Sequence, residues 1–148
     1  MKSDSQLKYQ NITFIKGLKD VYCALVLKDG RIAIGNDCLK IYNGKSFNFD
    51  FEIPLKKFSD KSDIIRFTFN KLIYLKNGDI LVNNDSKKFF IIKIIDNEKK
   101  YNILEKFESN RQFCWITRIC ELSNNLIATI GVPYDIEFFS KNDKNKYY

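Results

Sequence analysis

The chain has 148 residues, of which 45% are hydrophobic and 15% aromatic, and its formal net charge is +7. A chain of this length suits one domain with a real core, and this apolar content excludes a disordered polymer. It contains no histidine, which removes histidine-based acid–base and nucleophilic chemistry and the commonest metal ligand.

Three hairpins are predicted along the chain, and each joins an apolar run ending on leucine to a second short apolar run. The paired runs are Val21–Leu27 with Ile32–Ile34, Leu72–Leu75 with Ile80–Val82, and Ile116–Leu122 with Leu126–Ile130. The turns between them are Asp29-Gly30, Asn77-Gly78 and Asn124-Asn125, which stand 48 and then 47 residues apart. Such dipeptides favour two-residue type I′ turns, in which both central residues take positive φ. A fixed period of this size indicates a repeat architecture.

A third strand follows each hairpin, and an acidic residue stands before it. The third strands are Leu39–Tyr42, Phe89–Ile95 and Ile136–Phe139, and the acids are Asp37, Asp85 and Asp135. Paired acids are also the machinery of glycosidases. Because these acids recur once per repeat in turns, where Asp satisfies backbone donors, we interpret them as structural turn acids.

A fourth strand in each repeat completes the predicted pattern. The fourth strands are Tyr9–Ile15, Phe47–Ile53 and Tyr101–Phe107. We therefore expect about twelve antiparallel strands in three units of four, spanning residues 9–43, 44–96 and 97–140. A flexible N-terminus, residues 1–8, precedes them, and a polar tail, residues 141–148, is expected to fray.

The segment from Leu27 to Asp37, running into Leu39–Tyr42, resembles the blade signature of WD-repeat (Trp-Asp repeat) β-propellers. Leu122–Ile130 resembles the same hairpin in divergent members. The resemblance covers about residues 9 to 140 and implies an all-β chain of three consecutive four-stranded propeller blades, each locked by its turn acid. The chain departs from the family in lacking the Gly-His pair, and Tyr42-Asn43 and Phe139-Ser140 replace the closing Trp-Asp.

Three blades are too few for a closed ring, because propellers typically have four to eight. Four arrangements remain open: a piece of a longer gene product, two copies in a six-bladed ring, an open arc, or a ring completed by a partner. The open flanks of apolar blades need covering, since exposed strand edges invite pairing. We therefore expect self-association or partner capture.

Cysteines and chain ends bear on localisation. The four cysteines form no C-x-x-C pair: Cys23, Cys38, Cys114 and Cys120. The polar start, Met1–Gln6, lacks the apolar region of a secretory signal, and no apolar run approaches the roughly 20 residues that span a bilayer. We expect a cytoplasmic chain whose reduced thiols pack as small hydrophobes.

The function implied by the resemblance is a non-enzymatic protein–protein interaction scaffold, without catalytic residues, metal or cofactor. Arg111, Phe113 and Trp115 are a candidate partner surface, since Trp and Arg are enriched at binding hot spots. The other interpretation is that Trp115 simply packs between blades. The alternative function is a basic nucleic-acid or anionic-surface binder, because the chain carries a net charge of +7.

Overall fold

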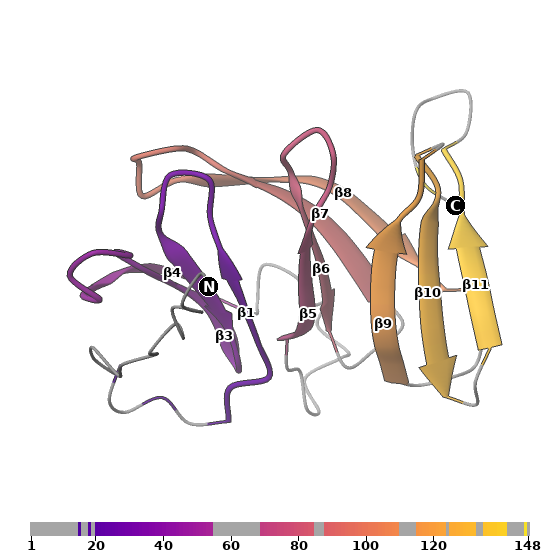
Figure 1. The fold of residues 1–148 in the computed structure, drawn as a ribbon, viewed down its shortest axis with the longest axis horizontal. Coiled ribbons are helices and arrows are strands. Elements are labelled where there is room, and N and C mark those ends of the chain that lie inside the picture. Colours follow the sequence, from indigo (N-terminus) through magenta and orange to yellow (C-terminus); the bar gives the residue numbers. More distant parts are fainter. Residues whose placement is uncertain are drawn as a thin grey trace, which may run out of the picture.

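A computed structural model describes residues 15, 18, 20–54, 69–84, 88–109, 115–123, 125–132, 135–141 and 147. These residues hold eleven strands and no helix (Figure 1). The strands are β1 (Cys23–Val26), β2 (Ile32–Gly35), β3 (Cys38–Tyr42), β4 (Phe49–Pro54), β5 (Phe69–Tyr74), β6 (Ile80–Asn84), β7 (Lys88–Ile94), β8 (Tyr101–Glu108), β9 (Trp115–Glu121), β10 (Ile127–Val132) and β11 (Asp135–Phe139). They form three antiparallel sheets of four, four and three strands, which confirms the all-β prediction.

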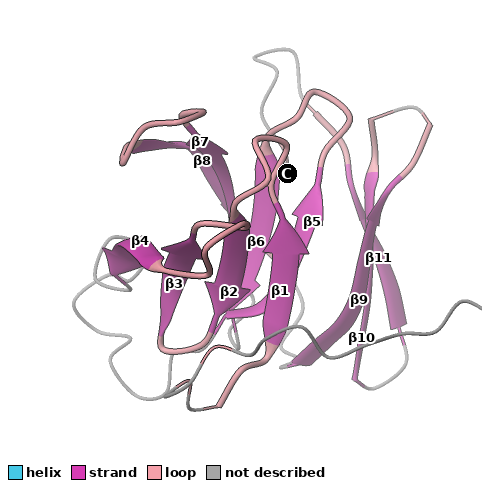
Figure 2. Cartoon of the chain, turned by 60° about the vertical axis from the view of Figure 1, so that its left-hand side comes forward, coloured by secondary structure: helices cyan, strands magenta, loops and turns pink. Residues whose placement is uncertain are grey.

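Each sheet is a meander, in which strands that follow one another in the chain are hydrogen-bonded neighbours. The first sheet has the order β1-β2-β3-β4, the second β5-β6-β7-β8 and the third β9-β10-β11 (Figure 2). The predicted strand Tyr9–Ile15 lies outside the described residues, apart from Ile15 itself. Short connections between alternating apolar runs explain the meanders, since antiparallel neighbours need only a tight turn.

Pairing places the sheet boundaries at positions that differ from the predicted repeat units. The units 44–96 and 97–140 begin with β4 and β8, yet β4 pairs with β3 and β8 pairs with β7. A sequence period gives the length of a repeat. It does not give the residue at which a sheet begins.

The sheets follow one another in chain order with their first strands adjacent. β1 lies next to β5, and β5 lies next to β9. Figure 1 shows the result as three sheets side by side, with the second between the other two. We call the contact between the first and second sheets the first joint, and the contact between the second and third sheets the second joint.

The second sheet is buried on both faces. On β7, Phe90 and Ile92 face the first joint, whereas Phe89 and Ile91 face the second. A strand covered on both sides needs a continuous apolar run, which explains the sequence of β7. The buried residues of the first joint are Leu27, Ala33, Leu39, Ile41, Ile53, Leu72, Ile80, Val82, Phe90 and Ile92. Those of the second joint are Leu75, Leu81, Phe89, Ile91, Phe107, Ile116, Ile127, Phe139 and Tyr147.

The hairpins form where predicted, but the type I′ geometry is wrong for the first two. Of the dipeptides Asp29-Gly30 and Asn77-Gly78, only the glycines have positive φ, 85° and 90°. The Gly30 N–H donates to the carbonyl of Leu27, and the Gly78 N–H donates to that of Leu75. Each loop therefore has three residues, a type I turn followed by a left-handed glycine. Asn125 takes the left-handed position of the third hairpin, with φ 60°; Asn124 lies outside the described residues.

The structure differs from the prediction at two further residues, Phe47 and Tyr147. Phe47 belongs to the β3–β4 turn and not to a strand, because its φ is 57° and its N–H donates to the carbonyl of Asn43. The Asn43 side chain also accepts the N–H groups of Lys45 and Ser46, which fixes this turn. Tyr147 is buried in the second joint, so the expectation of a frayed tail is wrong at this residue.

Candidate interaction surface

Arg31 connects the first sheet to the second at the hairpin end, the end of the molecule that holds loops 28–30 and 76–78. Its Nε donates to Asp29 Oδ2 over 2.7 Å, and one terminal nitrogen lies 3.3 Å from Asp50 Oδ2. The same guanidinium donates to the carbonyls of Glu98 and Ile95, at 2.7 and 2.8 Å. Arg31 is buried. A buried guanidinium satisfied in this way braces two sheets and is not available to a ligand.

Asp29 is the second half of this brace. Burial alone would raise the pKa of Asp29, but hydrogen bonds from Arg31 and from the Asn97 N–H, together with the Arg31 charge, lower its pKa below the ordinary value. The Asn97 bond is 3.2 Å long and again crosses to the second sheet. Asp29 is therefore a structural anion at the first joint.

A second inter-sheet contact repeats from one joint to the next. The Lys28 N–H donates to the Tyr74 hydroxyl over 2.6 Å, and the Lys76 N–H donates to Glu121 Oε2 over 2.5 Å. Lys28 and Lys76 occupy the same place after the leucine of their hairpins. Tyr74 and Glu121 occupy the same place at the end of the next sheet's first strand, since they pair with Ile80 and Ile127. The two joints thus share one geometry at this end.

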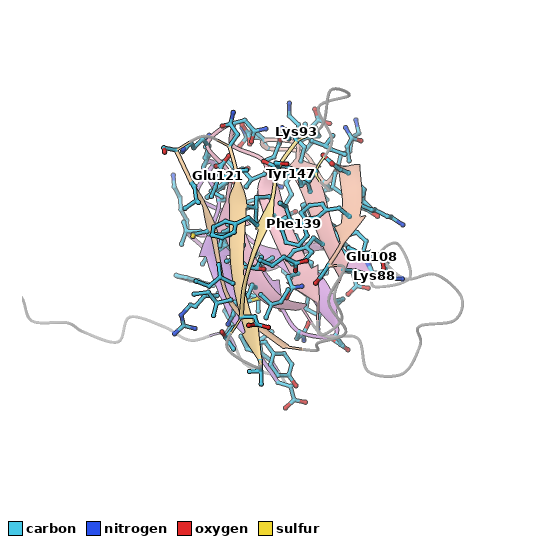
Figure 3. The ribbon with its side chains drawn as sticks, turned by 90° about the vertical axis from the view of Figure 1, so that its right-hand side faces the viewer. Lys88, Lys93, Glu108, Glu121, Phe139 and Tyr147 are labelled. Carbon is cyan, nitrogen blue, oxygen red and sulfur yellow. The ribbon has the colours of Figure 1, made fainter. Side chains whose placement is uncertain are left out.

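Two hollows lie between the hairpin loops. One, of about 530 Å³, is bordered by Asp29 and Asp50, both bound to Arg31. The other, of about 320 Å³, is bordered by Glu121 and Glu105. Glu121 accepts the Lys76 N–H, and Glu105 accepts the N–H of Tyr147. Figure 3 shows Glu121 and Tyr147 at this end of the third sheet. Each of these four carboxylates therefore has a partner within the chain and helps to hold the loops and strands of this end together.

The outer face of the third sheet, which points away from the second sheet, is apolar and exposed. Phe138 is 57% exposed and Ile136 is 51% exposed. The strand pairing places Arg118, Cys120, Ala128, Ile130, Val132, Ile136 and Phe138 on this face, so one charged side chain, Arg118, lies among the apolar ones. In contrast, Phe139 points into the second joint, where it packs against the rings of Phe89 and Phe107 at centroid distances of 5.1 Å (Figure 3). A solvated sheet face usually carries polar residues, so this face is suited to contact.

The outer face of the first sheet, at the opposite end of the row, is also apolar. Val26 is 65% exposed and Phe49 is 54% exposed. The Phe49 ring packs edge-on against Tyr42, with centroids 5.8 Å apart. The strand pairing places Ala24, Val26, Ile32, Ile34, Lys40, Tyr42, Phe49 and Glu52 on this face, so its apolar side chains adjoin Lys40 and Glu52, which pair with each other across β3 and β4. Both ends of the row of sheets therefore present apolar side chains.

Of the predicted turn acids, the structure describes Asp37 in the first sheet and Asp135 in the third. Asp37 is exposed just before β3, and the side chain that accepts a turn N–H there is its neighbour Asn36, from Cys38 over 3.2 Å. Asp135 is the first residue of β11 and pairs with Gly131, so it does not occupy the place of Asp37. Trp115 begins β9. Three predicted residues lie outside the described residues: Asp85, Arg111 and Phe113.

Sequence reasoning missed both Arg31 and the apolar face around Phe138. The partners of Arg31 at Ile95 and Glu98 lie in a turn of another repeat, and no local pattern connects them. The face around Phe138 did leave a signal. Ile136 and Phe138 are apolar on one side of β11 while Phe139 is apolar on the other, the pattern of a strand covered on both faces.

The thiols of Cys23 and Cys38 are shielded from solvent and are poor nucleophiles. Cys38 is buried, Cys23 is half-buried and Cys120 is exposed. Burial raises the pKa of Cys23 to about 11. Burial and the neighbouring carboxylates of Asp37 and Glu52 raise the pKa of Cys38 to about 12. Since the thiolate is the nucleophile, these two cysteines act as packing residues. The described residues also contain no group of three Cys, Asp or Glu placed to hold a metal ion.

No protein-family model, no curated protein and no solved structure matches this chain. What the structure shows is an all-β fold of three small antiparallel sheets. The resemblance to WD-repeat proteins is supported at that level only. Among the described residues, no helix is long and apolar enough to cross a membrane.

Proposed function

We propose that this chain is a non-enzymatic protein–protein interaction module, formed by three WD-like propeller blades and acting in the cytoplasm. Its meandering sheets and adjacent first strands, β1 beside β5 and β5 beside β9, support an arrangement of blades around a common axis. The unbridged thiols of Cys38 and Cys120 suit a reducing compartment.

The observation that carries this proposal is the outer face of the third sheet. Phe138 and Ile136 are exposed there, although a large apolar side chain gains about 1.5–3 kcal/mol when it is buried. Contiguous exposed apolar residues mark contact surfaces in soluble proteins. Aromatic residues at the centre of such a surface supply most of the binding energy.

Photo-crosslinking in the native cell tests the proposal. A benzophenone amino acid at position 138 is expected to give a protein adduct, because Phe138 lies within the contact. The matched control is the same label at Leu104, which is 49% exposed on β8 and belongs to neither outer face. Equal labelling at both positions, or none at 138, contradicts an interaction surface at this sheet.

The second candidate function is binding to nucleic acid or an anionic surface, and the net charge of +7 favours it. Lys99 and Lys100 are exposed but already paired, with Asp50 at 3.2 Å and Glu98 at 2.8 Å. A salt titration of oligonucleotide binding separates the two functions. If the logarithm of the binding constant falls with the logarithm of the salt concentration at a slope that corresponds to several neutralised phosphates, the result supports this second candidate.

A further inference from the structure

The two joints of this molecule use equivalent positions of successive sheets. Val26 pairs with Ile32 in the first sheet, as Tyr74 pairs with Ile80 in the second and Glu121 with Ile127 in the third. We take these three pairs as equivalent positions and number the other residues of each sheet from them. Each sheet then has one face that receives the preceding sheet and one face that receives the following sheet.

The outer face of the third sheet carries the pattern of a face that receives a following sheet. The residues at equivalent positions of the three sheets are Ala33, Leu81 and Ala128 on the second strand, and Leu39, Phe89 and Ile136, then Ile41, Ile91 and Phe138, on the third strand. In the first two sheets all of these side chains are buried in a joint. In the third sheet Ile136 and Phe138 are exposed. The sequence thus retains an apolar docking face on the third sheet, which no further sheet covers among the described residues.

The outer face of the first sheet carries the complementary pattern. Its equivalent positions across the three sheets are Ile32, Ile80 and Ile127 on the second strand, and Tyr42, Ile92 and Phe139 on the third. The residues of the second and third sheets in these sets are buried against the preceding sheet. The first sheet therefore presents the face that a preceding sheet would cover.

We propose that the outer face of the third sheet packs on the outer face of the first sheet of a second copy, so that two copies close six sheets into a ring. This inference rests on the proposed function and names its partner. The contact is heterologous, because the two faces differ, and such contacts close into rings when the rotation between units permits. Six blades lie within the usual range for a propeller. The joint between copies continues the two joints that already exist inside the chain.

One feature distinguishes the joint between copies from the internal joints. The internal joints have a polar acceptor at Tyr74 and Glu121 for the N–H of Lys28 and Lys76. At the position equivalent to these acceptors the first sheet has Val26, so the N–H of Ser123 finds no acceptor there. The contact between copies then consists of apolar side chains together with Arg118 of one copy and Lys40 and Glu52 of the other. We expect it to dissociate on dilution while each copy stays folded.

Sedimentation equilibrium of the purified chain over a range of concentrations tests the assembly. The expected result is a reversible change between one and two chain masses. Phe138→Asp on the third sheet, and Val26→Lys on the first, are each expected to raise the dissociation constant by about 30-fold or more, the loss typical of a hot-spot residue. Leu104→Asp is the matched control and should leave the constant unchanged. Circular dichroism checks that all variants fold, which is expected because all three side chains are exposed.

Mixing the two variants tests the heterologous geometry. A Phe138→Asp copy still has a native first sheet, and a Val26→Lys copy still has a native third sheet, so the mixture should recover two-chain particles through one intact joint. If Val26→Lys alone stays fully dimeric, like faces pair with each other and the proposal is wrong. A chain that remains single, or that forms larger open polymers, also overturns it. One further result separates this inference from the proposed function. If the purified chain stays single in sedimentation and the crosslink at position 138 joins it to a different protein, the inference is wrong and the proposed function stands.

Discussion

Loss of the buried Arg31 side chain should weaken the contact between the first and second sheets. The substitution Arg31→Met removes the partner of Asp29 and Asp50 and the donor to two carbonyls of the β7–β8 turn. We expect the free energy of unfolding to fall by about 3 kcal/mol, because breaking a buried ion pair from one side leaves a buried charge without compensation. Urea unfolding of the variant and the native chain measures this difference.

The double substitution Asp29→Ala with Arg31→Met is the control for this interpretation. It removes the buried carboxylate together with its partner, so the double variant should be more stable than Arg31→Met alone. If the two variants unfold at the same urea concentration, Asp29 does not carry the cost, and the carbonyl contacts to Ile95 and Glu98 account for the loss.

Asp29 also predicts how stability depends on pH. Its pKa in the folded chain lies below the ordinary value, which is about 3.9 in an unfolded chain. The stabilisation from its charge is therefore complete above the ordinary value and is lost as the pH falls through the folded pKa. The stability difference between the native chain and Asp29→Asn should be large at neutral pH and shrink below about pH 4. Thermal unfolding across this range measures it, and a difference that stays constant in acid would contradict the assignment.

At the scale of the elements, the β3–β4 turn sits directly against the first hairpin. A Cβ added to Gly44 would overlap the carbonyl oxygen of Gly30, so one of the two loops must move. We expect Gly44→Ala to lower the free energy of unfolding by about 2 kcal/mol, the usual cost of overpacking. Lys45→Ala, an exposed change in the same turn, is the control and should cost less than about 0.5 kcal/mol. Equal stability of the two variants would mean that the turn adapts without cost.

The strands were largely predictable because alternation and hairpin dipeptides are local signals. Phe89–Ile95 predicted a strand, and its continuous apolar run reflects burial on both faces. The turn geometry was not predictable. Asp29-Gly30 fits both a two-residue and a three-residue loop, and the choice depends on whether Lys28 belongs to the strand. Phe47 fits a strand by alternation, but the Asn43 side chain places it in the turn.

The candidate site was less accessible from sequence than the elements. Arg31 stands 64 and 67 positions from the two residues whose carbonyls it binds, and only the packing of one sheet on another brings them together. The exposed faces depend on the count and order of the sheets. Ile136 and Phe138 form a surface because, in the part of the chain that the structure describes, no other sheet lies on the outer side of the third one (Figure 1).

At the scale of the whole molecule, the second sheet connects the other two. The first and second joints lie on its opposite faces and share no buried residue. Stability in such a row approximates a sum of units and nearest-neighbour contacts. The end sheets should therefore open separately, although both depend on β5–β8.

Hydrogen exchange in two core variants tests this independence. Phe139→Ala removes the ring that packs on Phe89 and Phe107 in the second joint, and should accelerate exchange in β9–β11 while β1–β4 keep native rates. Ile41→Ala, fully buried in the first joint, should give the reverse pattern. Truncations of this kind cost about 2–5 kcal/mol. Each truncation is made in a chain that also carries Val26→Lys. This second substitution is expected to prevent contact between copies, so that exchange reports the single chain. If either truncation accelerates exchange equally in all three sheets, the molecule unfolds as one cooperative unit and the joints are not separable.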